Sequence, residues 1–183
     1  MATNSKLMNR HGTVAPGKNF WKQPPLIKIF EALGTLGDKD RIKPCAPSEK
    51  RSKSELCWRV YSSERNKFYL VRANKDFNAL TANDNGSYWQ GYLGYPMIAV
   101  LLQEGLVKFN HRLADDLRGI PWKKINTRFK NNYEKTIEYC LNLLERKGWQ
   151  KKEVLKEINK IRGQLNNLKI KKLGPRIPPP RAK

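Results

Sequence analysis

Residues 56–71 read LCWRVYSSERNKFYLV, and this stretch decides the fold of the chain. Its two ends are rich in β-branched and aromatic residues, which favour strands. The polar residues at its centre, 62–67, suit a turn. We therefore predict a β-hairpin with strands at residues 56–61 and 68–71.

The hairpin lies in the part of the chain where charge is balanced. Residues 55–105 carry five Lys or Arg and five Asp or Glu, and they hold half of the aromatic residues. A neutral, aromatic-rich segment is typical of a buried core. We predict that residues 55–105 form the centre of a single globular domain spanning residues 24–168.

Apolar residues at helical spacing predict helices on both sides of this centre. The first follows Pro24 and Pro25 and ends at Gly34 or Gly37. Others are predicted at 95–103, 122–147 and 151–168, with a short strand at 106–109. The link at 148–150 is short, so we expect residues 122–168 to form an antiparallel helical hairpin. The predicted fold class is α+β, a small β-hairpin or sheet core with about five helices, ending in that helical hairpin and a basic tail.

The terminal and connecting segments lack regular apolar spacing. We predict a flexible basic arm at residues 1–23, a polar loop at 38–54, a turn cluster at 81–87 and a basic, proline-rich tail at 169–183. Segments of this composition bury too little apolar surface to offset the entropy of ordering them.

The net charge of +21 is the strongest functional indication in the sequence. A compact chain with this charge repels itself, and its usual partners are phosphate backbones or anionic lipid surfaces. A pI near 10.1 is typical of nucleic-acid-binding proteins. No apolar stretch approaches the about 18 residues of a transmembrane helix, so we predict no membrane span.

Residues 111–131 place basic side chains around a glycine turn. A short helix containing Ala114 would lead through Gly119 and the apolar Ile120 to a second helix opened by Pro121. This pattern resembles helix-turn-helix DNA-binding proteins, although the gap from Ala114 to Gly119 is one residue longer than theirs. The resemblance implies a second helix that reads the major groove. Its outward-facing contacts would be Lys123, Lys124, Asn126, Thr127, Arg128 and Lys130. The alternative is a plain corner before an amphipathic helix with a basic exposed face.

The predicted hairpin at residues 59–71, followed by the apolar residues 94–101, resembles the hairpin and helix of SWIM-type zinc modules. No Cys or His stands at the ligand positions of those modules. The resemblance therefore implies a shared topology and no zinc.

The basic C-terminal residues are a second predicted contact with nucleic acid. Residues 151–183 carry eleven Lys or Arg against two Glu. Such tails follow phosphate backbones and often become ordered on binding. The alternative is a solubilising tail, although solubility needs a net charge of only about 2–8. The predicted contacts in the tail are Lys169, Lys171, Lys172, Arg176 and Arg181.

Three aromatic residues, Tyr88, Trp89 and Tyr92, surround a glycine in a turn-rich segment. Such residues can form a stacking platform for unpaired bases. They can equally cover the core, and we expect the core because the local segment contains no Lys or Arg.

The candidate catalytic residues form no complete motif. Asp115 and Asp116 follow His111 by one helical turn, with Asp84 as a further carboxylate, but a two-metal nuclease needs several converging carboxylates. The spacing favours a solvated helix face, and residues 83–86 favour a tight turn over a cation loop.

The three cysteines, Cys45, Cys57 and Cys140, form no CxxC or CxxH pair. We therefore predict no structural zinc, no other metal and no cofactor. Buried, reduced thiols are expected in a cytoplasmic protein.

Together these patterns predict a non-enzymatic nucleic-acid-binding protein of the cytoplasm or nucleoid. It would contact the phosphate backbone of DNA or RNA through basic helix faces and tails, and it could belong to a larger nucleoprotein assembly. The alternatives are a nucleic-acid-processing enzyme such as a nuclease and a peripheral protein on anionic membranes.

Overall fold

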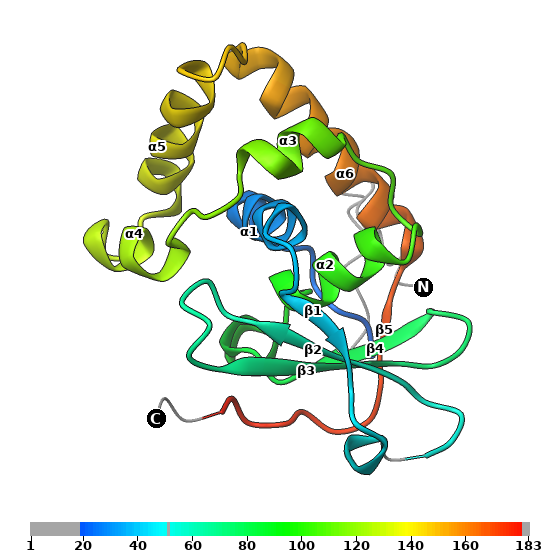
Figure 1. Cartoon of the computed structure of the whole chain (residues 1–183). Helices are drawn as coiled ribbons and strands as arrows, with labels where there is room; N and C mark the ends of the chain where they lie inside the picture. The colour runs from blue at the N-terminus through cyan, green and yellow to red at the C-terminus, as the bar shows by residue number, and fades with distance from the viewer. Residues whose placement is uncertain (1–18, 51, 181–183) are drawn as a thin grey trace, which may run out of the picture.

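The computed structural model describes residues 19–50 and 52–180, which form a sheet with helices packed over one face (Figure 1). The strands described are β1 (Ile42–Pro44), β2 (Leu56–Tyr61), β3 (Phe68–Ala73), β4 (Ala79–Ala82) and β5 (Lys171–Lys172). They lie in the order β1-β2-β3-β4-β5. The pairs β1·β2, β2·β3 and β3·β4 are antiparallel, whereas β5 runs parallel to β4. The predicted α+β class is confirmed.

The helices stand on one side of the sheet, with α1 at their centre (Figure 1). The α-helices described are α1 (Leu26–Gly37), α2 (Tyr95–Gln103), α3 (His111–Asp116), α4 (Trp122–Arg128), α5 (Tyr133–Glu145) and α6 (Lys151–Leu168). Single turns form at η1 (Pro47–Glu49) and η2 (Gly86–Gln90). Among these helices, none combines the length and the apolar character needed to span a bilayer.

The predicted hairpin is formed by β2 and β3 and lies under α2. Trp58 pairs with Val71, and Val60 pairs with Tyr69. Trp58, Val60 and Val71 are buried in the core, and α2 packs over β3 and β4. The hairpin therefore supplies the central strands of the sheet, as its β-branched and aromatic residues predict.

Helix α1 contacts α2, α3, α5 and α6, so it is the centre of the helical layer. It ends at Gly37, as predicted. A Cβ at Gly37 would lie 1.9 Å from the carbonyl oxygen of Ala114 in α3. Only glycine allows the two helices to approach this closely.

Three strands, β1, β4 and β5, were not predicted, and β5 lies in the segment predicted as a basic tail. β1 lies in the segment predicted as a polar loop. Pro44 lacks an amide hydrogen and is therefore atypical of strands, although an edge strand can contain it. β4 overlaps the predicted turn cluster at 81–87 and was too short to show a period. The strand predicted at residues 106–109 is wrong, since these residues connect α2 to α3.

The helix predicted at residues 122–147 is two helices, α4 and α5. Lys130 and Asn131 adopt left-handed φ angles of 51° and 60°. Asn132 then begins α5, where its side-chain oxygen accepts a hydrogen bond of 3.1 Å from the amide of Lys135. Asparagine is a favoured N-cap for this reason. The apolar spacing continues through the break, so periodicity alone concealed it.

Helices α5 and α6 are joined at Gly148, whose φ is 86°. They contact each other and both contact α1. In Figure 1 they diverge from their link instead of lying side by side. The expected close antiparallel hairpin is therefore open, because α1 takes up part of the apolar face of each helix.

Residues 19–22 and 170–172 pair with the rest of the fold, which corrects the predicted flexible arm and basic tail at these positions only. Trp21 is buried, and its indole nitrogen donates to the carbonyl of Leu80 at 2.9 Å. Ile170 is buried as well, and β5 follows it. These apolar anchors lie among basic residues that suggested disorder. Residues 1–18 and Arg181 lie outside the described residues.

The cysteines also differ from the expectation of reduced thiols. Cys45 and Cys57 form a disulfide with their Cα atoms 5.3 Å apart, which joins the end of β1 to β2. Cys140 is free and buried, as expected, and burial raises the pKa of its thiol to about 12. The spacing of 12 residues between Cys45 and Cys57 gave no signal for this pairing.

Candidate nucleic-acid interface

Three segments that are far apart in the sequence meet beside β5. The amide of Lys22 donates to Gly91 at 3.0 Å, and the amide of Leu93 donates back to Lys22 at 3.0 Å. On the other side of the N-terminal segment, the amide of Lys172 donates to Asn19 at 2.8 Å. Residues 19–22 therefore lie between the C-terminal strand and the turn that follows η2.

This arrangement brings together Lys22, Lys172 and Arg176, which we call the edge cluster. Burial lowers the pKa of the Lys172 ammonium, and the positive charges of Arg176 and Lys22 lower it further. Lys172 Nζ lies 5.7 Å from the centre of the Trp21 ring. These like charges repel one another, so an anion bound among them is stabilised.

Arg176 connects the edge cluster to η2. Its Nη1 donates to the carbonyl oxygen of Tyr88 at 2.8 Å. A Cβ atom at position 91 would lie 3.0 Å from Nη2 of Arg176. Gly91 has no Cβ atom to hinder this close approach, and its φ of 70° also favours glycine.

The side chain of Trp89 projects from η2 into solvent. It is 68% exposed, and it is the large hydrophobic side chain that stands out as exposed in the described residues. Tyr88 contacts it edge to face, with ring centroids 4.6 Å apart. Our expectation that this aromatic residue covers the core is therefore wrong for Trp89.

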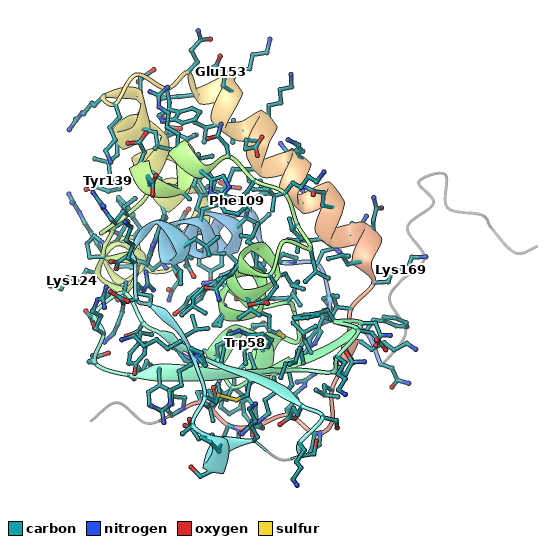
Figure 2. The ribbon with its side chains drawn as sticks, turned by 45° about the vertical axis from the view of Figure 1, so that its right-hand side comes forward. Trp58, Phe109, Lys124, Tyr139, Glu153 and Lys169 are labelled. Atoms are coloured by element: carbon teal, nitrogen blue, oxygen red, sulfur yellow. A yellow bond between two sulfur atoms is a disulfide. The ribbon has the colours of Figure 1, made fainter. Side chains whose placement is uncertain are left out.

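The solvent face of α6 extends the positive surface. Lys152, Lys156 and Lys160 are exposed and spaced by four residues, which places them in one row along the helix. Figure 2 shows the side chains of α6 pointing away from the body of the protein, down to Lys169. Lys169 and Lys171 are also exposed, so the predicted tail contacts begin at the end of this helix.

Helices α3 and α4 form the predicted helix, glycine turn and helix. Gly119 has a φ of 73°, and Ile120 is buried between the helices as predicted. α4 has only seven residues, so it is about 10 Å long. Whether it reads DNA stays a prediction.

The predicted contacts on α4 divide into two groups. Most of them are exposed: Lys123, Lys124, Thr127, Arg128 and Lys130. Lys123 is held by Glu64 of the β2–β3 loop at 3.0 Å, and it lowers the pKa of that carboxylate. Asn126 does not face outward. Its side-chain nitrogen donates to Glu31 at 3.0 Å, and its oxygen accepts from Thr136 at 3.1 Å.

A polar cleft of about 230 Å³ lies between α1, α4 and the β2–β3 loop. Its floor is the ion pair of Lys28 and Glu31, in which Nζ lies 2.9 Å from the carboxylate. Burial alone would lower the pKa of Lys28, but the charge and hydrogen bond of Glu31, together with Tyr133 and Asp84, outweigh burial and raise the pKa. Because Glu31 also accepts from Asn126, the ion pair positions α4 against α1.

The candidate catalytic carboxylates have structural partners. Asp116 accepts from the indole of Trp149 at 2.9 Å and pairs with Arg112 and Lys147. Asp84 is buried and accepts from the amide of Ser87 at 3.1 Å. Within residues 19–50 and 52–180, no three His, Cys, Asp or Glu side chains converge as metal ligands. His111, Asp115, Asp116 and Asp84 are thus not brought together.

A family model described as Uncharacterised conserved protein UCP014422 matches residues 21–171. The chain belongs to this family. The matched range starts at Trp21 and ends in β5, so it includes Lys22 and Trp89 but not Lys172 or Arg176. A search of the curated proteins and a search of the solved structures returned no match.

Two members of this interface were missed at the level of sequence. Lys22 was assigned to a flexible arm, although Trp21 beside it is the kind of large apolar residue that anchors a segment. Trp89 was assigned to the core because no basic residue is near it in sequence. Arg176 reaches that turn from 88 residues further along the chain, and no local pattern could reveal this.

Proposed function

We propose that this protein binds nucleic acid through its phosphate backbone and has no catalytic role there. The observation that carries the proposal is the edge cluster, in which backbone hydrogen bonds hold Lys22 and Lys172 and a side-chain hydrogen bond to Tyr88 holds Arg176. Phosphates would relieve the repulsion among these cations and release counterions from the nucleic acid. The exposed lysines of α6, Lys152, Lys156 and Lys160, provide further positive charge for phosphate binding.

The proposal covers DNA and RNA, and it includes membership of a larger nucleoprotein assembly. The cations that would contact phosphate are Lys22, Lys172 and Arg176, with the lysines of α6 as additional contacts. The exposed residues of α4 are a further proposed contact surface, without the base-reading role for Asn126 that the sequence suggested.

We also propose a location in the cytoplasm or on the nucleoid. The disulfide between Cys45 and Cys57 is more typical of oxidising compartments. The check is to fractionate cells and to detect the protein in each fraction. Recovery with the cytoplasm or the nucleoid supports this location, and recovery outside the cytoplasm contradicts it.

The experiment that tests the binding proposal removes charge from the edge cluster. The double variant Lys22→Ala/Arg176→Ala is compared with Lys39→Ala/Lys135→Ala, which removes the same charge from exposed positions elsewhere. Binding of a labelled oligonucleotide is followed by fluorescence anisotropy from about 50 to about 200 mM salt. Circular dichroism confirms that each variant is folded.

Loss of two phosphate contacts should reduce the slope of log K against log[salt] by about 1.4 for a single strand and about 1.8 for a duplex. The control variant should retain the wild-type slope. Equal losses in both variants would contradict the assignment to the edge cluster. Absence of binding by the wild-type protein at about 50 mM salt would overturn the proposed function.

A further inference from the structure

The turn η2 presents Trp89 on a fixed backbone. Ser87 is buried and bonds through its amide to Asp84 at 3.1 Å. At the other end of the turn, the amide of Gly91 donates to Gly86 at 3.1 Å, and the carbonyl of Gly91 accepts from Lys22 at 3.0 Å. A large aromatic ring is thus exposed by a rigid support, which lowers the entropy lost when a ligand binds to it.

The exposed ring lies next to the edge cluster along the backbone. Trp89 follows Tyr88, whose carbonyl oxygen binds Arg176 at 2.8 Å. It precedes Gly91 by two residues, and the carbonyl oxygen of Gly91 accepts a hydrogen bond from the amide of Lys22. An aromatic ring flanked by cations is the arrangement with which proteins bind single strands, because bases stack on the ring and phosphates pair with the cations.

We propose that Trp89 stacks on an unpaired nucleobase while Lys22 and Arg176 hold adjacent phosphates, so that the protein prefers single-stranded nucleic acid to duplex. This inference rests on the proposed function and deepens it. In a duplex the faces of the bases are stacked on one another and cannot reach the indole. Phosphate contacts remain in a duplex, so duplex binding is weaker but not lost.

An anionic membrane surface is the competing partner for an exposed Trp near cations. Proteins that lie on membranes bury a continuous apolar face of a helix. In η2 the neighbours of Trp89 include Ser87 and Gln90, and in the described residues Trp89 stands out as the exposed large hydrophobic side chain. One aromatic ring with polar neighbours is better suited to stacking on a single base than to inserting into a lipid layer.

The test separates the contribution of bases from that of phosphates. Affinities are measured at one salt concentration for three oligonucleotides of about 16 nucleotides, the upper end of known single-strand site sizes. One is a single strand, one is the duplex, and one is a single strand with abasic sites, which keeps the phosphates and lacks bases. DNA and RNA versions of each distinguish the two sources of the same chemistry.

The variants are Trp89→Ala, Trp89→Phe and the control Gln90→Ala, which alters an exposed neighbour in the same turn. Trp89→Ala should weaken single-strand binding by about 5- to 150-fold, the effect of one stacked base. It should leave duplex and abasic binding within about twofold of the wild type. Trp89→Phe should restore much of the affinity, and Gln90→Ala should retain it.

Each outcome decides one claim. Equal binding of the single strand and the abasic strand by the wild-type protein overturns the stacking role of Trp89, as does a full-affinity Trp89→Ala variant. Binding to vesicles of phosphatidylserine that depends on Trp89, without such dependence for single strands, also overturns it. Failure to bind any of the oligonucleotides overturns the proposed function itself, which is a different result from binding without strand preference.

Discussion

Replacing Glu31 by glutamine would remove one negative charge from the buried contact between α1 and α4. Glu31 is only 3% exposed, and its carboxylate accepts from Lys28 and Asn126. Glutamine keeps the shape of the side chain and an oxygen that can accept from Asn126. The variant therefore isolates the loss of charge, which leaves the ammonium of Lys28 without its carboxylate.

The magnitude follows from the burial of the pair. Removing one partner of a buried ion pair costs about 3–5 kcal/mol. The side chain of Lys28 is 13% exposed to solvent and lines the cleft. Because its ammonium can reach water there, we expect the lower end, about 3 kcal/mol. In a domain of this size, that loss lowers Tm by about 6–12 °C.

The assay is urea unfolding followed by circular dichroism, with Lys28→Met/Glu31→Gln as the matched variant. The double variant removes both charges of this pair, so its stability should return to within about 1 kcal/mol of the wild type. A loss below about 1 kcal/mol for Glu31→Gln would refute the role of the pair. A double variant less stable than the single one would refute it as well.

Three further predictions concern stability. Gly37→Ala should destabilise the protein by several kcal/mol, or prevent folding, because its Cβ would lie 1.9 Å from the Ala114 carbonyl oxygen; urea unfolding of the purified variant measures this. Cys45→Ser/Cys57→Ser should lose about 2–3 kcal/mol, as expected for a short disulfide loop, and reductant should lower the stability of the wild type but not of this variant. Burial raises the pKa of Tyr69 to about 12 from 10.0, so the folded state resists losing this proton. Stability should therefore fall as the pH rises from about 10 to about 12, and it should fall less in Tyr69→Phe.

Local patterns were enough to predict the central parts of the fold. The hairpin, α1, α2 and α6 follow from β-forming residues and from helical apolar spacing that continues over whole elements. The break between α4 and α5 escaped detection because Phe129 and Tyr133 preserve the spacing across it. The signal present was Asn131-Asn132, since asparagine both tolerates a left-handed φ and caps a helix.

The candidate site was less accessible to sequence reasoning because its parts meet only in the folded chain. The basic tail was recognised, but β5 and its contact with residues 19–22 depend on tertiary pairing. Trp89 was dismissed because its own segment holds no cation, whereas Lys22 and Arg176 arrive from the two ends of the chain. Glu31 left a visible sign, an acidic residue in the apolar face of α1 three residues after Lys28.

The most direct test of the central claim is the salt dependence of oligonucleotide binding by the wild-type protein. Anisotropy is recorded for a single strand and its duplex from about 50 to about 200 mM salt. Our account predicts that log K falls linearly with log[salt] for both, with tighter binding of the single strand at every concentration. Affinity that is undetectable at low salt, or independent of salt, would contradict binding through phosphates.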